Sequence, residues 1–382
     1  MRPSLPRTPG QHLYSMVMSK LEILEYDYFD LEYMTKEGFL TWLDHEKAVG
    51  KQQSQSKEYL FNFAVKFYTP HPNLLEDEYT RYLFALQIKK DLCSGALNCN
   101  ENTAALLAAF IVQAEIGDFL EDLYLDPGYL LSLKLFKNVS NQFLLKVMEC
   151  HRTLIGQTPN ESDYNLLDTV RKVELYGLKL HVAKDPENVQ VGISVCHQGV
   201  VVVKGTSKTQ TYSWARIRKL SFKRKKFLLK LHPNCLDSVD YSFETRDECK
   251  SFWKQCIEHH AFFRSQSVLG SKKKKSQGVT KGSSFVYTGR TQKELIEYVR
   301  ENYGKLSNFE RSASTGRVAK CRAPTYSGAL LPTVQKIATN NSNGALTDSG
   351  AFYHARSAAS GLAAGYSSTP LAGVDILGWF SQ

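Results

Sequence analysis

The spacing of apolar residues changes from a helical period to an alternating one at Leu178, so no single uniform architecture can accommodate the chain. From Asn73 to Tyr176 the apolar residues fall into helical segments such as LLEDEYTRYLFALQIKKDLCSG and ENTAALLAAFIVQAEIGDF. From Leu178 to Phe243 the pattern alternates in six short segments: LKLHVA, VQVGISVCH, GVVVVKG, TYSWARIRKLSF, KFLLKLH and DSVDYSF. The sequence therefore predicts an all-helical domain followed by a closed set of strands, a small barrel or sandwich.

A smaller mixed region precedes the helical domain. Apolar residues at three- and four-residue spacing predict an amphipathic helix from Leu13 to Leu24. The segments YFDLEY, GFLTWLD and YLFNFAVKFY, the last covering residues 59 to 68, then predict strands, and TPHP ends the region. We expect a short α+β lobe here.

Capping residues set the predicted ends of the helices in the middle domain. Gly95 is expected to end one helix, because glycine adopts the left-handed C-cap conformation readily. The tetrapeptide TPNE has Thr158 as N-cap and Glu161 at the third helical position, which is the pattern of a capping box. The helix that opens there is expected to stop at Gly177.

Two further capping boxes lie near the C-terminal end of the strand region and beyond it. Thr245 with Glu248 predicts a helix that crosses the strands, and Thr291 with Glu294 predicts a short, marginal helix that ends at Gly304. Ser, Thr and Gly make up 39 of the 118 residues after Arg264. Apart from the short helix, this stretch is therefore expected to be tail without a packed core.

The net charge of +10 is unevenly distributed along the chain. Between Asn188 and Leu236 there are ten Lys and Arg and no Asp or Glu. Residues 265 to 382 contain fifteen basic and six acidic residues, or +9, and the remaining residues sum to 23 minus 32, or −9. An acidic body with a basic face and a basic tail indicates anionic partners, such as phospholipid headgroups or nucleic acid.

Signatures of export, membrane spanning and catalysis are missing from the sequence. The opening MRPSLPRTPG has no apolar core of a signal peptide, and the longest aliphatic runs are shorter than the about 20 residues that span a bilayer. No G-x-x-x-x-G-K, HExxH or GxSxG motif occurs, so we expect no enzyme and no cofactor. Cys256, His259 and His260 lack a second ligand pair, so we expect reduced cytosolic thiols and no metal.

Several motifs in order resemble a known family. VKFYTPHPNLLEDEYTRYLFALQIKKDLCSGALNC, VQAEIGDF, the TPNESDYNLLD stretch, WARIRKLSFKRKKFLLKL and CKSFWKQCIEHHAFFR resemble the FERM domain of the superfamily that includes band 4.1, ezrin, radixin and moesin. GSSFVYTGRTQKEL resembles the FERM-adjacent segment found in a subset, including FERM proteins fused to Rho guanine-nucleotide exchange and pleckstrin modules. The resemblance extends from about residue 13 to about residue 306.

The resemblance implies a three-lobed cloverleaf and assigns the segments to its parts. The expected parts are a ubiquitin-like lobe at 1–72, a helical lobe like acyl-CoA-binding protein at 73–177, a PH-like β-sandwich with a C-terminal helix at 178–264, a FERM-adjacent segment at 265–306 and a largely disordered tail at 307–382. Two departures stand out. MRPSLPRTPG replaces the β-hairpin that should open the first lobe, so this lobe looks truncated, and Asp30 stands where the family commonly has glycine, so we expect an altered turn there.

The stretch RIRKLSFKRKKFLLKLH, residues 216 to 232, is predicted to form a hairpin with KRKK at its turn. In its second strand Phe227, Leu229 and Leu231 share one face, as strand alternation requires. In its first strand Ile217 is out of phase with Leu220 and Phe222, which predicts a bulge.

These considerations give three sets of candidate residues. Lipid headgroups are expected at Arg216, Arg218, Lys219, Lys223, Arg224, Lys225, Lys226, Lys272, Lys273, Lys274 and Lys275. PH-like lobes of this family resemble phosphotyrosine-binding domains, which implies a peptide groove at Ile217, Leu220, Phe222, Phe252 and Trp253. Phosphorylation is expected at Ser283, Ser284 and Ser314, the last because Arg311 precedes it by three residues.

The predicted function is a non-enzymatic adaptor between membrane and cytoskeleton, cytoplasmic and peripheral at the plasma membrane. Its expected partners are anionic phospholipids, cytoplasmic tails of membrane proteins, and cytoskeletal or Rho-GTPase pathway proteins. One alternative is the regulatory FERM portion of a Rho-family guanine-nucleotide exchange protein, without its catalytic module. Nucleic acid is the less favoured anion, because Phe222 and Phe227 are expected in the core rather than as exposed stacking platforms.

Overall fold

A three-stranded antiparallel sheet and two α-helices build the N-terminal lobe. The computed structural model describes residues 5–53, 59–133, 139–232, 238–264, 285–302, 309 and 311, which all lie within one compact unit of the chain. The sheet order is β2–β1–β3. The elements of this lobe are η1 (Leu5–Arg7), α1 (Gly10–Lys20), η2 (Tyr26–Tyr28), β1 (Phe29–Met34), β2 (Leu40–Trp42), α2 (Val49–Gln52) and β3 (Asn62–Val65).

The two departures of this lobe have different outcomes. Residues 5 to 9 contain only η1 and one isolated bridge from Pro9 to Ala48, so no hairpin precedes α1 within the described residues. The expectation of an altered turn at Asp30 is wrong. Asp30 lies inside β1, opposite Ala64 of β3, and its side chain is buried.

Four α-helices form the middle lobe. Its elements are η3 (Pro72–Leu74), α3 (Glu78–Ser94), α4 (Glu101–Ile116), η4 (Pro127–Leu133), α5 (Asn141–Arg152) and α6 (Pro159–Val170). Gly95 ends α3 at φ +75°, in the left-handed conformation predicted for it. The capping box at the start of α6 is also confirmed, with reciprocal hydrogen bonds between Thr158 and Glu161.

The predicted end of α6 is wrong, because the helix stops at Val170 and tighter turns continue to Gly177. Gly177 has φ +68°, and a Cβ there would lie 2.6 Å from the Tyr68 side chain. This glycine therefore allows a close approach of the chain to the N-terminal lobe and does not cap the helix.

Seven antiparallel strands and a long helix form the C-terminal lobe. The strands are β4 (His181–Lys184), β5 (Gln190–Cys196), β6 (Gly199–Lys204), β7 (Ser207–Ser213), β8 (Ile217–Lys223), β9 (Lys226–Leu231) and β10 (Ser238–Phe243), and the helix is α7 (Arg246–Arg264). The sheet order is β7–β6–β5–β4–β10–β9–β8. β7 and β8 both stand at edges, so the strands described do not form the closed set predicted from the sequence.

The segment TYSWARIRKLSF is two strands rather than one. The chain turns between β7 and β8, where the Arg216 N–H donates to the Ser213 carbonyl at 2.9 Å. The Trp214 indole N–H donates to the His197 carbonyl at 2.9 Å, and the ring is buried in the lobe. The turn at residues 214 to 216 therefore ends β7 before β8 begins.

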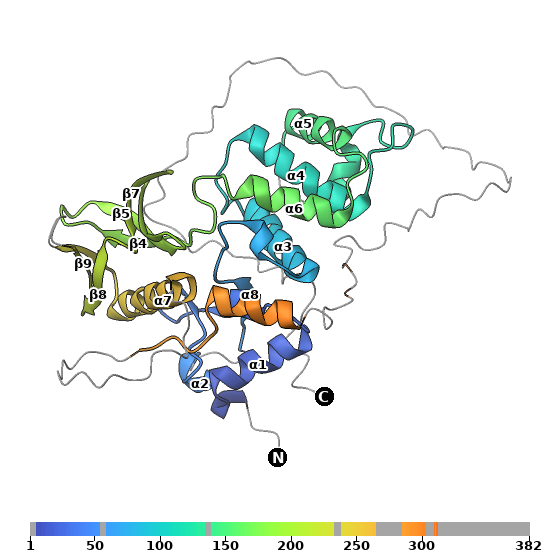
Figure 1. Ribbon diagram of the computed structural model, residues 1–382. Helices are drawn as coiled ribbons and strands as arrows, with labels where there is room; N and C mark the ends of the chain where they lie inside the picture. Colours follow the sequence, from blue (N-terminus) through green and yellow to red (C-terminus); the bar gives the residue numbers. More distant parts are fainter. Residues whose placement is uncertain are drawn as a thin grey trace. The chain divides into compact units, whose positions relative to one another are not determined.

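The three lobes contain two apolar cores rather than three. The N-terminal and middle lobes share one continuous buried cluster, whereas the C-terminal lobe has its own cluster under α7. The short helix α8 (Gln292–Glu301) belongs to the first cluster and lies beside α7 (Figure 1). Leu295 and Val299 of α8 are 0 % exposed, so the expectation that this helix is marginal is wrong. Its capping box at Thr291 and Glu294 is confirmed.

Candidate lipid and peptide surfaces

The β8–β9 hairpin has the geometry that its sequence predicts. Phe222 lies opposite Phe227 and Leu220 opposite Leu229, with these side chains directed to the core of the lobe. The register shifts between Ile217 and Lys219, which confirms the predicted bulge. The turn is Arg224 and Lys225, and Arg224 takes φ +56°, an uncommon conformation for a residue other than glycine.

The outer face of the hairpin brings like charges directly opposite one another. Lys219 pairs with Lys230 and Lys223 pairs with Lys226, and all four side chains are exposed. Like charges at opposed strand positions destabilise a sheet. Folding of the hairpin therefore concentrates positive charge on its outer face, although this charge does not stabilise the sheet.

Few carboxylates balance this face within the described residues. Lys226 forms an ion pair with Asp240 of β10 at 2.8 Å, between side chains that are largely exposed. No other Lys or Arg from 218 to 230 forms an ion pair with a described carboxylate. Arg216 lies in the turn before β8, and Arg218 at the bulge. Lys272, Lys273, Lys274 and Lys275 lie outside the described residues, as do Ser283, Ser284 and Ser314.

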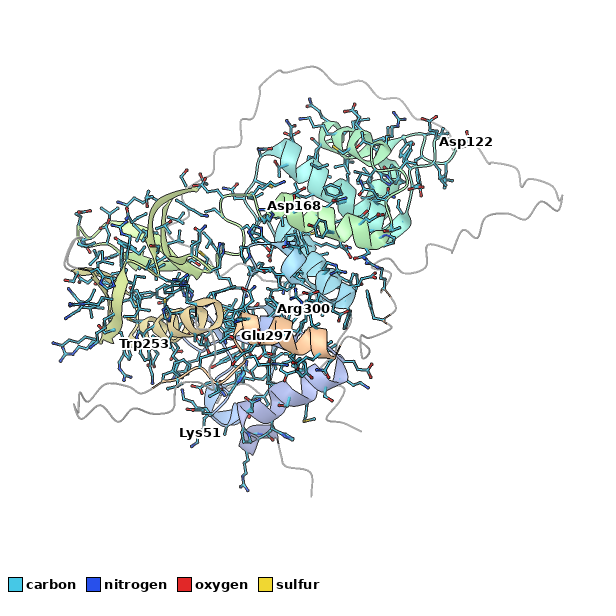
Figure 2. All side chains as sticks on the ribbon, in the orientation of Figure 1. Lys51, Asp122, Asp168, Trp253, Glu297 and Arg300 are labelled. Atoms are coloured by element: carbon cyan, nitrogen blue, oxygen red, sulfur yellow. The ribbon has the colours of Figure 1, made fainter. Side chains whose placement is uncertain are left out.

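The predicted peptide groove lies between β8 and α7. β8 pairs only with β9 among the described strands, so one of its edges carries no further strand. The Trp253 indole N–H donates to the Leu220 carbonyl at 3.4 Å, and the rings of Trp253 and Phe222 lie 5.2 Å apart. Figure 2 labels Trp253 on α7.

The five predicted groove residues differ in their access to a ligand. Ile217, Leu220 and Phe222 are half-buried against the core of the lobe, and Trp253 is 7 % exposed. Phe252 is 0 % exposed and packs on Phe227 and Phe243. A ligand on the surface can therefore reach the half-buried residues, whereas Phe252 serves as part of the core beneath them.

The chain's own FERM-adjacent segment contacts this groove, so direct capture of a peptide requires that the contact open first. The Phe285 ring lies 6.2 Å from the Trp253 ring, and the Lys254 Nζ lies 4.6 Å above the Phe285 ring. The aromatic pattern of SSFVYTGR was the only signal in the sequence. It indicates burial of the segment but does not identify where the segment docks.

Further along, the same segment reaches the other two lobes through arginines. Arg290 donates to Asp27 of η2 at 2.8 Å, and Arg300 of α8 donates to Glu76 at 2.7 Å. Beyond the bounds expected for this segment, Arg311 donates to Asp163 of α6 at 2.7 Å and to Glu78 of α3 at 3.2 Å. The segment that the sequence presents as a linker is thus joined to all three lobes.

The histidine and cysteine residues considered for metal binding have structural roles. Burial lowers the pKa of His259 to about 3, and its Nδ1 lies 2.9 Å from the Gln255 carbonyl oxygen. Burial raises the pKa of the Cys256 thiol. Among the described residues no group of three or more His, Cys, Asp or Glu could hold a metal ion, and no described helix is long and apolar enough to cross a bilayer.

The fold and these surfaces define a three-lobed module with a PH-like third lobe. Residues 5–55 match the FERM N-terminal domain, 70–181 the FERM central domain, 185–269 the FERM C-terminal PH-like domain and 279–319 the FERM adjacent (FA) region. The chain belongs to the FERM domain family.

Similar proteins include members that carry further domains. The chain is 42 % identical over 318 residues to mouse FERM, ARHGEF and pleckstrin domain-containing protein 2, which covers 82 % of this chain and 30 % of the relative. It is 44 % identical over 311 residues to human FERM domain-containing protein 7, covering 80 % of this chain and 43 % of the relative. The chain thus spans less than half the length of these relatives.

A solved structure shares the fold. The FERM domain of Drosophila Merlin, in complex with its C-terminal domain, has a TM-score of 0.61 and 22 % sequence identity, and covers 68 % of this chain and 91 % of the Merlin chain. At this identity the likeness concerns the fold alone.

Proposed function

We propose that this chain is a non-enzymatic adaptor that lies at the cytoplasmic face of the plasma membrane and links it to the cytoskeleton. The proposal rests on two opposed pairs of lysines on the exposed face of the β8–β9 hairpin. Lys219 lies opposite Lys230, and Lys223 lies opposite Lys226. Anionic headgroups would relieve the repulsion that these pairs create.

The expected strength of this contact is modest. Each basic residue near an anionic leaflet contributes about 1 kcal/mol, so Lys223, Arg224 and Lys225 together contribute about 3 kcal/mol. Lys226 contributes less, because Asp240 already lies 2.8 Å from its Nζ. Such an attraction favours reversible membrane contact, and the four lysines at 272–275 would strengthen it if they reach the same surface.

The second part of the proposed function is capture of cytoplasmic tails of membrane proteins. An extended peptide can add to an unpaired strand edge, and β8 has such an edge among the described strands. Ile217, Leu220 and Phe222 with Trp253 would contact its side chains. Backbone hydrogen bonds to β8 would supply affinity, and these apolar contacts would determine which peptide sequences bind.

The experiment that tests the lipid part of the proposed function compares the binding of the whole chain to phosphoinositide liposomes and to single-stranded nucleic acid. Sedimentation with phosphoinositide liposomes over a range of salt concentrations should show binding that weakens as salt rises. Filter binding of single-stranded nucleic acid under the same conditions should be weaker, because the outer face of the hairpin carries no aromatic residue in the described strands. Stronger retention of nucleic acid than of liposomes would contradict the lipid assignment.

A second candidate function is favoured by the relatives. Mouse FERM, ARHGEF and pleckstrin domain-containing protein 2 is 42 % identical over the matched region. The chain would then be the FERM portion of a Rho-family exchange protein and would regulate an exchange module. Co-purification of the chain with such a module, or with Rho-pathway proteins in preference to membrane-protein tails, would favour this candidate.

A further inference from the structure

Phe285 is the first described residue after α7, and it lies beside Trp253 at the groove between β8 and α7. Twenty residues, 265 to 284, separate it from the end of α7 and lie outside the described part. Its ring packs on Trp253 at 6.2 Å and belongs to the rim of the C-terminal lobe's core. Trp253 is the same side chain that bonds the Leu220 carbonyl of β8.

Lys254, which contacts the Phe285 ring, is also part of an ion pair between two lobes. The Lys254 Nζ lies 4.6 Å above the Phe285 ring, a distance typical of a cation–π contact. The same Nζ forms an ion pair with Asp44 of the N-terminal lobe at 2.8 Å. Lys254 is thus also held by Asp44, so its position does not depend on Phe285 alone.

Beyond Phe285 the segment is anchored at Arg290 and by α8. Arg290 donates its backbone N–H and its Nε to the two oxygens of Asp27, at 3.1 and 2.8 Å. Its guanidinium also lies between the rings of Tyr26 and Tyr298, at 4.5 and 4.0 Å. α8 follows with its buried residues. The half-buried Phe285 is held by ring contacts, so we expect it to open more readily than Arg290 and the buried residues of α8.

We propose that Phe285 is an intramolecular plug of the β8–α7 groove, and that a membrane-protein tail enters the groove only after Phe285 leaves Trp253. The described residues from Arg290 to Asn302 stay docked and hold the plug at high local concentration. The inference rests on the proposed tail-binding function, and it adds that the resting groove is occupied by the chain itself. The ligand it fits is an extended peptide with an aromatic residue that replaces the Phe285 ring.

The first test observes Trp253 without any partner. The whole chain is labelled with 5-fluorotryptophan, and the Trp253 resonance among the four tryptophans is assigned with Trp253→Phe. In Phe285→Ala this resonance should shift and become more sensitive to a soluble paramagnetic agent. Val286→Ala is the matched control, because Val286 is 66 % exposed on the same stretch. Phe285→Leu keeps an apolar side chain and should give an intermediate result, and circular dichroism checks that each variant is folded.

The second test uses a peptide with the chain's own sequence, SSFVYTGRTQ, as the probe. It should bind the folded Phe285→Ala chain at least about tenfold more tightly than the wild type, within the range of typical coupling between competing sites. A peptide with alanine in place of its phenylalanine should lose this advantage. Equal binding to both chains, or a Trp253 resonance unchanged in Phe285→Ala, would overturn the plug.

A third measurement separates the plug from the proposed function. Tail peptides of membrane proteins are titrated against wild type and Phe285→Ala. If the peptide SSFVYTGRTQ binds Phe285→Ala more tightly than the wild type but no tail peptide binds either chain, the tail-binding function is refuted and the plug is supported. If tails bind both chains with the same affinity, the plug is refuted and the tail-binding function stands.

Discussion

Lys66, directly after β3, and Glu258 of α7 form an ion pair of 3.1 Å that joins the N-terminal lobe to the C-terminal lobe. The same Nζ lies 2.8 Å from Asp30 of β1, and the side chains of Lys66 and Asp30 are almost fully buried. Burial opposes the charge of Asp30, but Lys66 and His45 outweigh it and lower the pKa of Asp30 to about 2. Asp30 is thus the anchor of an interlobe charge network.

Removal of Asp30 should destabilise the protein severely. Asp30→Ala leaves the buried Lys66 with Glu258 as its remaining carboxylate among the described residues, and breaking a buried pair typically costs about 3–5 kcal/mol. The free energy of unfolding in urea measures the loss. Glu297→Ala is the control, because its ion pair with Lys293 is exposed and should contribute less than about 1 kcal/mol. Similar losses in the two variants would show that the network is not buried in solution.

Reversal of the hairpin charges should abolish lipid binding and preserve the fold. Changing Lys223, Arg224, Lys225 and Lys226 to Glu removes an attraction of up to about 4 kcal/mol and replaces it with repulsion. Liposome sedimentation at moderate salt measures the effect. The matched control reverses four exposed lysines elsewhere, at Lys36, Lys47, Lys51 and Lys172. Unchanged sedimentation of the hairpin variant, or equal loss in the control, would refute a specific membrane face.

Two arginines of the FERM-adjacent segment should differ in their contribution to stability. Burial raises the pKa of Asp27, and Arg290 opposes that rise, so Arg290→Gln leaves a buried carboxylate without its cation. We expect a loss of about 3 kcal/mol and faster proteolysis of the segment. Arg300→Gln breaks an ion pair in which the arginine side chain is 68 % exposed, and should cost less than about 1 kcal/mol. Thermal unfolding of both variants makes the comparison, and equal shifts would contradict it.

Stability should depend on two buried histidines as the pH falls. Burial lowers the pKa of His259 to about 3 and that of His181 to about 4, below their ordinary value of 6.5. Because the folded pKa values are depressed, each histidine contributes stability above pH 6.5 that is lost as the pH falls toward the folded pKa. At pH 5 the loss is about 2 kcal/mol per histidine.

The variant His259→Leu tests this pH dependence, because it cannot take up the proton. Its unfolding free energy should change less than that of the wild type between pH 7 and pH 5, by about 2 kcal/mol. The exposed His12→Leu serves as control and should follow the wild type. Parallel curves for wild type and His259→Leu would mean that His259 is accessible to protons in the folded protein.

Phosphorylation of the tail should weaken membrane attachment. A phosphate subtracts about 1.5 to 2 charges, which at about 1 kcal/mol per charge reduces partitioning by tens of fold. The variants Ser283→Asp with Ser284→Asp, and Ser314→Asp, mimic this change and are compared with wild type in liposome partitioning. If all partition alike at low and physiological salt, the tail does not regulate attachment.

Local patterns in the sequence determined the parts of this protein. The change of apolar period at Leu178 separates the helical lobe from the strand lobe. Capping boxes mark the starts of α6 and α8, and alternation predicts the inner face of β9 and the bulge near Ile217. These features depend on hydrogen bonds and side-chain directions within a few residues, so neighbours in sequence are sufficient to predict them.

Only the tertiary structure decided how the parts are joined. Arg290 and Asp27 are 263 residues apart in sequence, and Lys66 reaches an acidic residue on α7. Phe285 covers Trp253 because α8 docks against the core shared by the first two lobes. No periodicity encodes such contacts, because a buried charge or ring is stabilised by whichever distant residue the packed lobes bring within a few ångström of it.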